Sequence, residues 1–385
     1  MTVYDDLVGQ PVVVADLRRA VAAAGTDDPT RSFTHAWLFT GPPGSGRSVA
    51  AGAFAAALEC PDDGCGTCNA CRTVRAGSHG DVTVVSPSGL SIPVEQAREI
   101  VRRVSSMPTS GRWQIVVIED ADRLTEAAAN ALLKAIEEPS PRGVFLLCAP
   151  APDDVPITIV SRCRSVALRA PSAADVAEML VRRDGVAEPM ALFAAQAAQG
   201  HVGRARRLAT DESARIARAA VLDVPLQVMR GVPDAMAAAA SLVDAAGEVA
   251  DAVSSRHDAA ETAAFRDAYG ENATGRAAPR GSAGLLKDLE KRQKARATRT
   301  TRDTLDGALL DLAAFYRDVL VLQSGALVAT VHGDQEAAAG RIAHATSPES
   351  TLRRIEAIVA AREALGLNVA PQLALEAMAL ALHAG

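Results

Sequence analysis

The stretch Ala36-Trp-Leu-Phe-Thr-Gly41-Pro-Pro-Gly-Ser-Gly46-Arg47-Ser48 decides the fold of the first part of this chain. A short apolar run, residues 36–40, leads into a glycine-rich loop, and an alanine-rich run typical of a helix, residues 49–59, follows. A strand, such a loop and a helix in this order form a phosphate-binding loop, because backbone N–H groups and the helix N-terminus point into one concavity. The residues expected around the phosphates are Gly41, Pro42, Pro43, Gly44, Ser45, Gly46, Arg47 and Ser48.

The loop departs from the usual pattern at one position. Arg47 stands where a lysine is usual, and its planar guanidinium is larger than the compact ammonium that reaches the terminal phosphates. Ser48 keeps the hydroxyl that would bind Mg²⁺. The sequence therefore predicts a loop able to hold ATP and Mg²⁺ but hydrolysing ATP weakly or not at all.

A second acidic element follows the apolar run 114–118, which ends in Glu119 and Asp120. A buried strand that delivers two carboxylates at its end is how enzymes with this loop hold Mg²⁺ and orient the attacking water. The usual order is Asp then Glu, and here it is reversed. Glu119 is expected on the metal side and Asp120 on the water side, where a misplacement of about 1 Å can cost roughly a hundredfold in rate.

Four cysteines lie within twelve residues, at positions Cys60, Cys65, Cys68 and Cys71. Tetrahedral Zn²⁺ takes four soft ligands, and the two-residue spacing lets neighbouring sulfurs chelate one ion. In a reducing compartment such cysteines favour metal binding over disulfides. The sequence therefore predicts a structural zinc site, with an iron–sulfur cluster or metal-free thiols as the alternatives.

The chain has 385 residues, of which 49% are hydrophobic, and a net charge of −6. Apolar runs alternate with helical patterns through about residue 165, which predicts a parallel sheet with crossover helices, whereas from about residue 173 onward only helical patterns remain. We expect three domains: 1–165, a helical one at 166–222 and a second helical one at 223–385. No apolar run is long enough to span a membrane and no secretory leader is recognised, so a cytoplasmic location is expected.

A basic segment, residues 276–302, follows the glycine-rich and small-residue stretch 270–284, which is expected to form a flexible loop. It carries nine Lys and Arg against Asp288 and Glu290, and three of the four lysines of the chain. Two interpretations stay open: a contact with DNA phosphates, and a solvated helix flank with an insertion, which is the favoured one.

Three further motifs complete a resemblance to a known family: Val3-Tyr-Asp-Asp-Leu-Val-Gly-Gln10, Asn130-Ala-Leu-Leu-Lys-Ala-Ile-Glu-Glu-Pro139 and Ser161-Arg162-Cys163. With the phosphate loop and the cysteine cluster, they resemble the clamp-loader branch of the AAA+ ATPases over residues 1–165. The resemblance implies an α/β AAA+ domain with a zinc knuckle, then a helical lid and a helical collar. It also implies a hetero-oligomer with other clamp-loader subunits, acting on the sliding clamp and primed DNA as part of the DNA polymerase III holoenzyme.

The departures from the family pattern select among its members. Besides Arg47 and the reversed acids, Cys148 stands where motor subunits carry a hydroxyl, and Gly203 stands at the place of the lid's sensor arginine, with Arg204 one residue along. Arg162 is kept, and the resemblance implies that it reaches the ATP site of a neighbouring motor subunit as an arginine finger. A catalytically weak subunit is therefore expected, with an active ATPase motor or a zinc-dependent nucleic-acid binding protein as alternatives. The leucine spacing of residues 305–322 suits either an inter-subunit face or an internal core.

Overall fold

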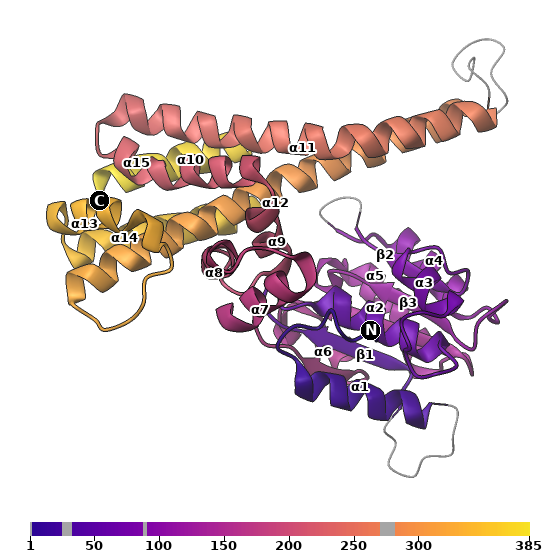
Figure 1. The fold of residues 1–385 in the computed structure, drawn as a ribbon. Coiled ribbons are helices and arrows are strands. Elements are labelled where there is room, and N and C mark those ends of the chain that lie inside the picture. The colour runs from indigo at the N-terminus through magenta and orange to yellow at the C-terminus, as the bar shows by residue number, and fades with distance from the viewer. Residues whose placement is uncertain (1, 25–32, 88–90, 270–281) are drawn as a thin grey trace. The chain divides into compact units, whose positions relative to one another are not determined.

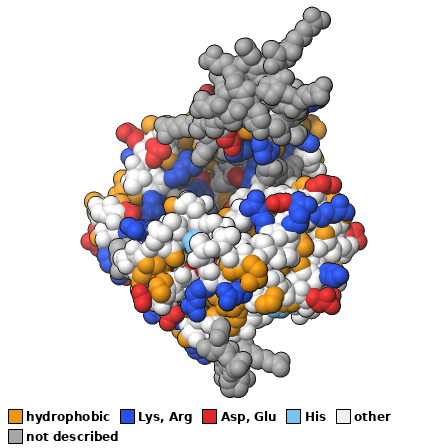
Figure 2. Space-filling model, turned by 90° about the vertical axis from the view of Figure 1, so that its right-hand side faces the viewer, with side chains coloured by type: hydrophobic (Ala, Val, Ile, Leu, Met, Phe, Trp, Pro, Cys, Tyr) orange, Lys and Arg blue, Asp and Glu red, His pale blue; other side chains and the backbone are white. Residues whose placement is uncertain are grey.

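The computed structural model describes residues 2–24, 33–87, 91–269 and 282–385. The chain forms two compact units, residues 1–210 and 211–385, each with its own core. Among the described residues, no helix is long and apolar enough to cross a membrane. One face of the protein, in Figure 2, shows basic, acidic and hydrophobic side chains interspersed.

A five-stranded parallel sheet forms the centre of the first unit, as the alternating pattern predicts. Its order is β2-β3-β4-β1-β5. Every residue of β1, β3 and β4 is buried, as expected for strands covered on both faces. The strands are β1 (Ala36–Thr40), β2 (Val82–Val85), β3 (Gln114–Ile118), β4 (Gly143–Ala149) and β5 (Arg164–Ala167).

Helices cover both faces of this sheet (Figure 1). On one face, Trp37 and Phe39 pack with the residues of α1 (Pro11–Ala23), α2 (Arg47–Glu59) and α3 (Asn69–Arg75). On the other face, the intervening strand residues pack with α4 (Val94–Val104), α5 (Glu126–Glu137) and α6 (Ile157–Val160). Three short helices, α7 (Ala173–Asp184), α8 (Glu188–Ala197) and α9 (Val202–Thr210), complete the unit.

The second unit is all helical, as predicted for this part of the chain. Figure 1 shows α11 and α12 side by side as a long helical pair. The helices are α10 (Glu212–Val228), α11 (Val232–Tyr269), α12 (Ser282–Ser324), α13 (Glu336–Ala345), α14 (Pro348–Gly366) and α15 (Pro371–Ala384). Leu305, Leu309 and Leu312 are buried in this unit, so most of the leucine repeat of α12 serves its internal core.

Helix α10 belongs to the core of the second unit, since Leu222, Val224 and Val228 are all buried there. The compact units therefore meet at residues 210 and 211, inside the range 166–222 expected for a lid. The three-domain division stays a prediction.

Candidate functional site

The glycine-rich loop joins the end of β1 to the start of α2 at the carboxyl edge of the sheet. Gly41, Gly44 and Gly46 have φ angles of 154°, 83° and 93°, a region that L-residues rarely adopt. A Cβ atom on Gly44 would lie 2.5 Å from the Cα atom of His201, just before α9. Glycine at this position therefore lets the loop lie directly against the helical part of the unit.

A pocket of about 430 Å³ opens beside the loop, a volume in the range of small-molecule sites. Ser48 lines it, whereas Gly41, Pro42 and Pro43 do not. The loop contributes residues 44–49, the N-terminal segment contributes Asp6, Leu7 and Val8, and the helices contribute Met179, Arg183, His201, Val202, Gly203 and Arg206.

The arginines contributed by the helices already have carboxylate partners. Arg183 pairs with Asp6, and Arg206 Nε lies 2.7 Å from Asp184 Oδ2. Arg204 is not among the lining residues. An anion in this pocket would compete with two ion pairs for these guanidinium groups.

His201 lies over the loop as a neutral ring. Its Nδ1 accepts a hydrogen bond from the backbone N–H of Arg204 at 3.2 Å, so the ring proton resides on Nε2. Partial desolvation of the ring and the charge of Arg204 lower the pKa of His201. The sequence offered no signal for this residue, because its role depends on a contact between segments far apart in the chain.

Three buried polar atoms near the loop have no hydrogen-bond partner within the described part of the chain: Arg47 Nη1, Ser45 Oγ and Asp122 Oδ1. Burial raises the pKa of Asp122, the charge of Asp120 raises it further, and Arg47 acts in the opposite direction. An unsatisfied buried polar group costs about 1–3 kcal/mol. Such atoms are suited to a polar ligand or a bound water.

Each of the two carboxylates after β3 interacts with a neighbouring side chain of the first unit. Glu119 accepts a hydrogen bond from the hydroxyl of Ser86, which follows β2. Asp120 has a left-handed backbone, with φ 55° and ψ 56°, and its Oδ2 lies 4.0 Å from Arg123 Nε. Neither carboxylate lines the pocket.

Cys148 lies in β4, next to the phosphate-loop strand. It pairs in register with Phe39 of β1 and is 2% exposed. Burial raises the pKa of its thiol to about 12; the charge of Glu119 also raises this pKa, whereas the charge of Arg47 lowers it. The Cys148 side chain is thus a neutral thiol, which is less polar than a hydroxyl group would be in the same position.

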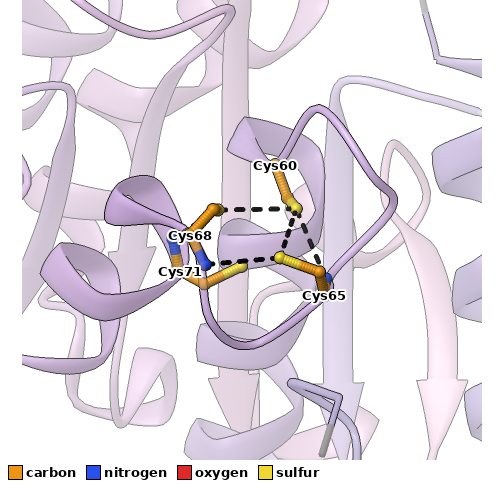
Figure 3. Close-up of side chains that lie close together, drawn as sticks. All are labelled: Cys60, Cys65, Cys68 and Cys71. Carbon is orange, nitrogen blue, oxygen red and sulfur yellow. Dashed lines mark hydrogen bonds between the residues drawn. The ribbon is translucent and has the colours of Figure 1, made fainter.

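The four clustered cysteines converge in space, as Figure 3 shows. The Sγ atom of Cys60 lies 3.6 Å from that of Cys65 and 3.7 Å from that of Cys68, and all four sulfurs lie within 4.8 Å of one another. Sulfurs bound at about 2.3 Å to one tetrahedral ion are about 3.8 Å apart. The four-cysteine cluster could therefore hold a metal ion.

Backbone N–H groups point at these sulfurs. The N–H of Cys65 lies 3.3 Å from Cys60 Sγ, the N–H of Cys68 lies 3.3 Å from Cys65 Sγ, and the N–H of Cys71 lies 3.4 Å from Cys68 Sγ. A hydrogen bond from the hydroxyl of Thr67 is the main cause that lowers the pKa of Cys65 to about 6. Such bonds favour the thiolate, which is the form that ligates metals.

Arg162 lies at the surface of the first unit, directly after α6. Its Nη1 donates to the carbonyl of Thr158 at 2.7 Å and to the hydroxyl of Ser161 at 3.2 Å, and its Nη2 pairs with Glu137 at the end of α5. The side chain keeps 38% of its surface exposed and does not line the pocket of its own chain. The guanidinium is thus fixed at three points while it faces solvent.

Comparison with known proteins gives a consistent set of relatives. Residues 22–172 match the family model described as DNA polymerase III, delta subunit. The chain is 39% identical to the delta′ subunit of Pseudomonas aeruginosa DNA polymerase III over 154 residues, which cover 38% of this chain and 47% of that protein. It is 33% identical to the tau subunit of Bacillus subtilis over 165 residues, which cover 42% of this chain and 28% of that protein.

Among solved structures, a gamma subunit-related protein of Thermotoga maritima matches with a TM-score of 0.45 and 15% identity, over 96% of this chain and 98% of that one. The sequence matches span less than half the length of the curated relatives named above.

Proposed function

We propose that the chain belongs to the DNA polymerase III subunits of the delta and tau type, which residues 22–172 resemble, and that it acts in DNA replication as a delta-prime-like clamp-loader subunit. In this role it is a stator that hydrolyses little or no ATP itself and assists a neighbouring tau/gamma-like motor subunit. The other partners are a delta-like subunit, the sliding clamp and primed DNA within the complex.

The placement of Arg162 carries this proposal. Its guanidinium is exposed, held by Glu137 and by the carbonyl of Thr158, and outside its own phosphate-loop pocket. An exposed arginine suits insertion into the ATP site of another subunit, where its guanidinium would exchange the ion pair with Glu137 for the charge on the transferred phosphoryl group. A guanidinium held in advance also loses less freedom when it docks.

The subunit's own phosphate loop supports the stator role. The helical arginines beside the loop are paired with Asp6 and Asp184, and Glu119 is bonded to Ser86 rather than aimed at the pocket. ATP would be held by the loop N–H groups and Arg47, with the hydroxyl of Ser48 directed to Mg²⁺. The unpartnered Arg47 Nη1 and Ser45 Oγ fit a bound phosphate, so we propose nucleotide binding without efficient turnover.

We propose Zn²⁺ as the occupant of the cysteine cluster. The sulfur separations of 3.6 and 3.7 Å fit ligands of one tetrahedral ion, whereas separate irons bridged by sulfide would hold their cysteines farther apart. All four donors come from residues 60–71, so the ion ties the end of α2 to α3 and serves structure rather than chemistry.

The collar helices offer surfaces for partner subunits. Leu352 and Val359 on α14, and Leu373 and Leu380 on α15, are 40–61% exposed, and each pair is seven residues apart. Seven-residue spacing places both members of a pair on one helix face. We propose that these faces pack against the helices of neighbouring subunits.

Reconstitution with a tau/gamma-like motor tests the arginine finger. In the complex with Arg162→Ala, hydrolysis at the ATP site facing this residue is expected to fall by roughly 10³–10⁵-fold. Native mass spectrometry checks that assembly is intact, and Arg142→Ala, another exposed arginine of the same unit, is the matched control. Unchanged DNA-stimulated ATPase in the Arg162→Ala complex excludes the finger role.

One observation favours the alternative of an active motor, namely the 430 Å³ pocket with the unpartnered Arg47 beside it. ATP turnover by the isolated chain separates the two roles. A rate equal to that of the motor subunit, abolished by Arg47→Ala, contradicts the stator proposal.

A further inference from the structure

Helix α12 carries an exposed row of lysines, Lys287, Lys291 and Lys294. The chain has 40 Lys and Arg residues but only four lysines, and three of the four stand in this row, which we name the lysine stripe. Nearly all the other basic residues of the chain are arginines. The lysine side chain differs from arginine in carrying a compact, strongly hydrated charge on a flexible stem, and three of these side chains occur on one short stretch of helix.

Three other cations of the basic segment, Arg296, Arg299 and Arg302, have partners within the second unit, whereas Arg292 is exposed beside the stripe. Arg296 Nη2 lies 2.7 Å from Asp258 Oδ1 and 2.6 Å from Glu261 Oε2, so this arginine joins α12 to α11. Arg276 and Arg280 lie outside the described residues. Arg296 therefore has a structural task and is not available to a partner.

The next two arginines are also engaged. Arg299 Nε lies 3.5 Å from Asp303 Oδ2 on the same helix, and Arg302 Nη1 donates to the carbonyl of Leu365 at 3.0 Å. The inner half of the basic segment thus stabilises the second unit. The net positive charge of the basic segment therefore does not by itself indicate a binding partner outside the chain.

The stripe has the opposite character. Spacings of four and three residues place its three lysines on one face of the helix, while Leu289, which is 5% exposed, lies on the face toward the helical pair. Glu290 lies on the same face, three residues after Lys287 and four before Lys294, and is exposed. Among the described side chains, no carboxylate forms an ion pair within 4 Å with any of the three lysines. Among the described side chains, the stripe is therefore exposed charge without an ion pair, three lysines against the single carboxylate of Glu290.

Neighbouring lysines at these spacings repel each other by a few tenths of a kcal/mol per pair, and Glu290 offsets part of that repulsion. The three lysines span about 10 Å of helix axis, whereas duplex DNA carries one negative charge per about 1.7 Å. Residues 282–302 contain no aromatic side chain that could stack on a base. These properties fit a sequence-independent contact with phosphates.

We propose that the lysine stripe binds the phosphate backbone of DNA. The choice of DNA over an acidic polypeptide rests on the proposed role in replication, while the stripe itself rests on the geometry of α12. The contact is distinct from the phosphate loop and from Arg162, both of which lie in the first unit.

Fluorescence anisotropy with a labelled 30-base-pair duplex and the full-length isolated chain tests this contact between 20 and 200 mM NaCl. The variant Lys287→Gln/Lys291→Gln/Lys294→Gln keeps good helix formers on α12. The matched control, Arg207→Gln/Arg230→Gln/Arg341→Gln, removes three exposed cations elsewhere and changes the net charge equally. Circular dichroism checks that both variants keep their helix content.

Neutralising three phosphate contacts predicts that the slope of log affinity against log salt becomes shallower by about 2.7 in the stripe variant and stays unchanged in the control. Lys→Arg at the same three positions is expected to restore it. The proposal is overturned if the wild type does not bind DNA, if the stripe variant binds like the wild type, or if polyglutamate binds in a stripe-dependent manner and DNA does not. The stator role is read out separately, by ATPase of the reconstituted complex.

Discussion

At the scale of single residues, a buried polar network in the second unit fixes the state of His332. Arg218 Nη2 lies 2.9 Å from His332 Nδ1, and because a guanidinium only donates, Nδ1 must accept and the proton resides on Nε2. Nε2 in turn lies 3.2 Å from the carbonyl of Asp311. The ring is 1% exposed and neutral, and burial together with Arg218 lowers its pKa.

This network predicts a loss of stability in acid. The unfolded chain takes up a proton on this histidine below about pH 6.5, whereas the folded chain, with its lowered pKa, resists it. The free energy of unfolding is therefore expected to fall as pH drops from about 6.5, by at most about 1.4 kcal/mol per pH unit from this residue. Asp318, which accepts from the N–H of His332, and Asp334, which pairs with Arg218, also face the ring.

Urea unfolding at pH 7.5 and pH 5.5 measures the effect, and His332→Gln is the reference because it cannot titrate. Other histidines contribute equally to both proteins. A pH dependence that is the same in the wild type and in the variant contradicts the assignment.

Gly44 makes a second prediction at the residue scale. Gly44→Ala places a Cβ atom 2.5 Å from the Cα of His201 on a backbone with φ 83°, so we expect a destabilisation of about 2 kcal/mol or more. Gly52→Ala is the control, because Gly52 lies inside α2 with no atom within 4 Å of the added methyl, and there alanine is expected to stabilise by about 0.5–1 kcal/mol. Thermal unfolding compares the two, and equal melting temperatures would contradict the close contact.

At the scale of elements, the cysteine cluster joins α2 to α3 through a loop that uses Gly64 and Gly66 at positive φ. We expect one equivalent of zinc per chain by elemental analysis, and a lower melting temperature after chelation because metal binding is coupled to folding. Cys65→Ser is expected to weaken the metal, whereas Cys163→Ser, outside the cluster, is expected to leave it in place. Iron with visible absorbance, or a chain that binds no metal, contradicts the assignment.

Sequence reasoning found the elements whose pattern is strong and local. The continuous apolar runs 36–40 and 114–118 predicted β1 and β3, because parallel strands buried on both faces contain almost no polar residue. It missed β5, where Arg164 and Ser165 are polar and only Val166 is buried. This edge strand is specified by its pairing with β1, a contact that no local pattern reveals.

The site shows the same division. The spacing of the cysteines and of the glycines is local, so the convergence of four sulfurs and the position of the loop could be anticipated. The contact of His201 with Gly44, the pairing of Arg183 with Asp6 and the bond from Ser86 to Glu119 join distant segments. Asp122 follows Asp120 by two residues in the sequence, but no sequence pattern distinguishes it. Only its burial in the structure identifies it as a candidate site residue.

At the scale of the whole molecule, two separate cores imply two foldable parts. A fragment of residues 211–385 keeps all of α10 and the Arg218–Asp334 ion pair, so it is expected to fold alone as a helical protein. A fragment of residues 223–385 lacks Leu222 and Arg218 and is expected to lose about 3 kcal/mol or more. Circular dichroism and urea titration of both fragments measure the difference, and equal stability would place the boundary at 222 instead.

The length of α12 has a consequence for how a weak contact becomes useful. From Leu305, buried in the core, to Lys287 is about 27 Å along the helix, so the lysine stripe stands on an arm that extends outward from the bundle. Three phosphate contacts by themselves give weak and salt-sensitive binding. Once other subunits hold the same DNA molecule, however, the arm presents its charges at an effective local concentration near the millimolar range. The stripe would then act through avidity, shortening the search for the duplex and slowing its escape, without adding any sequence preference.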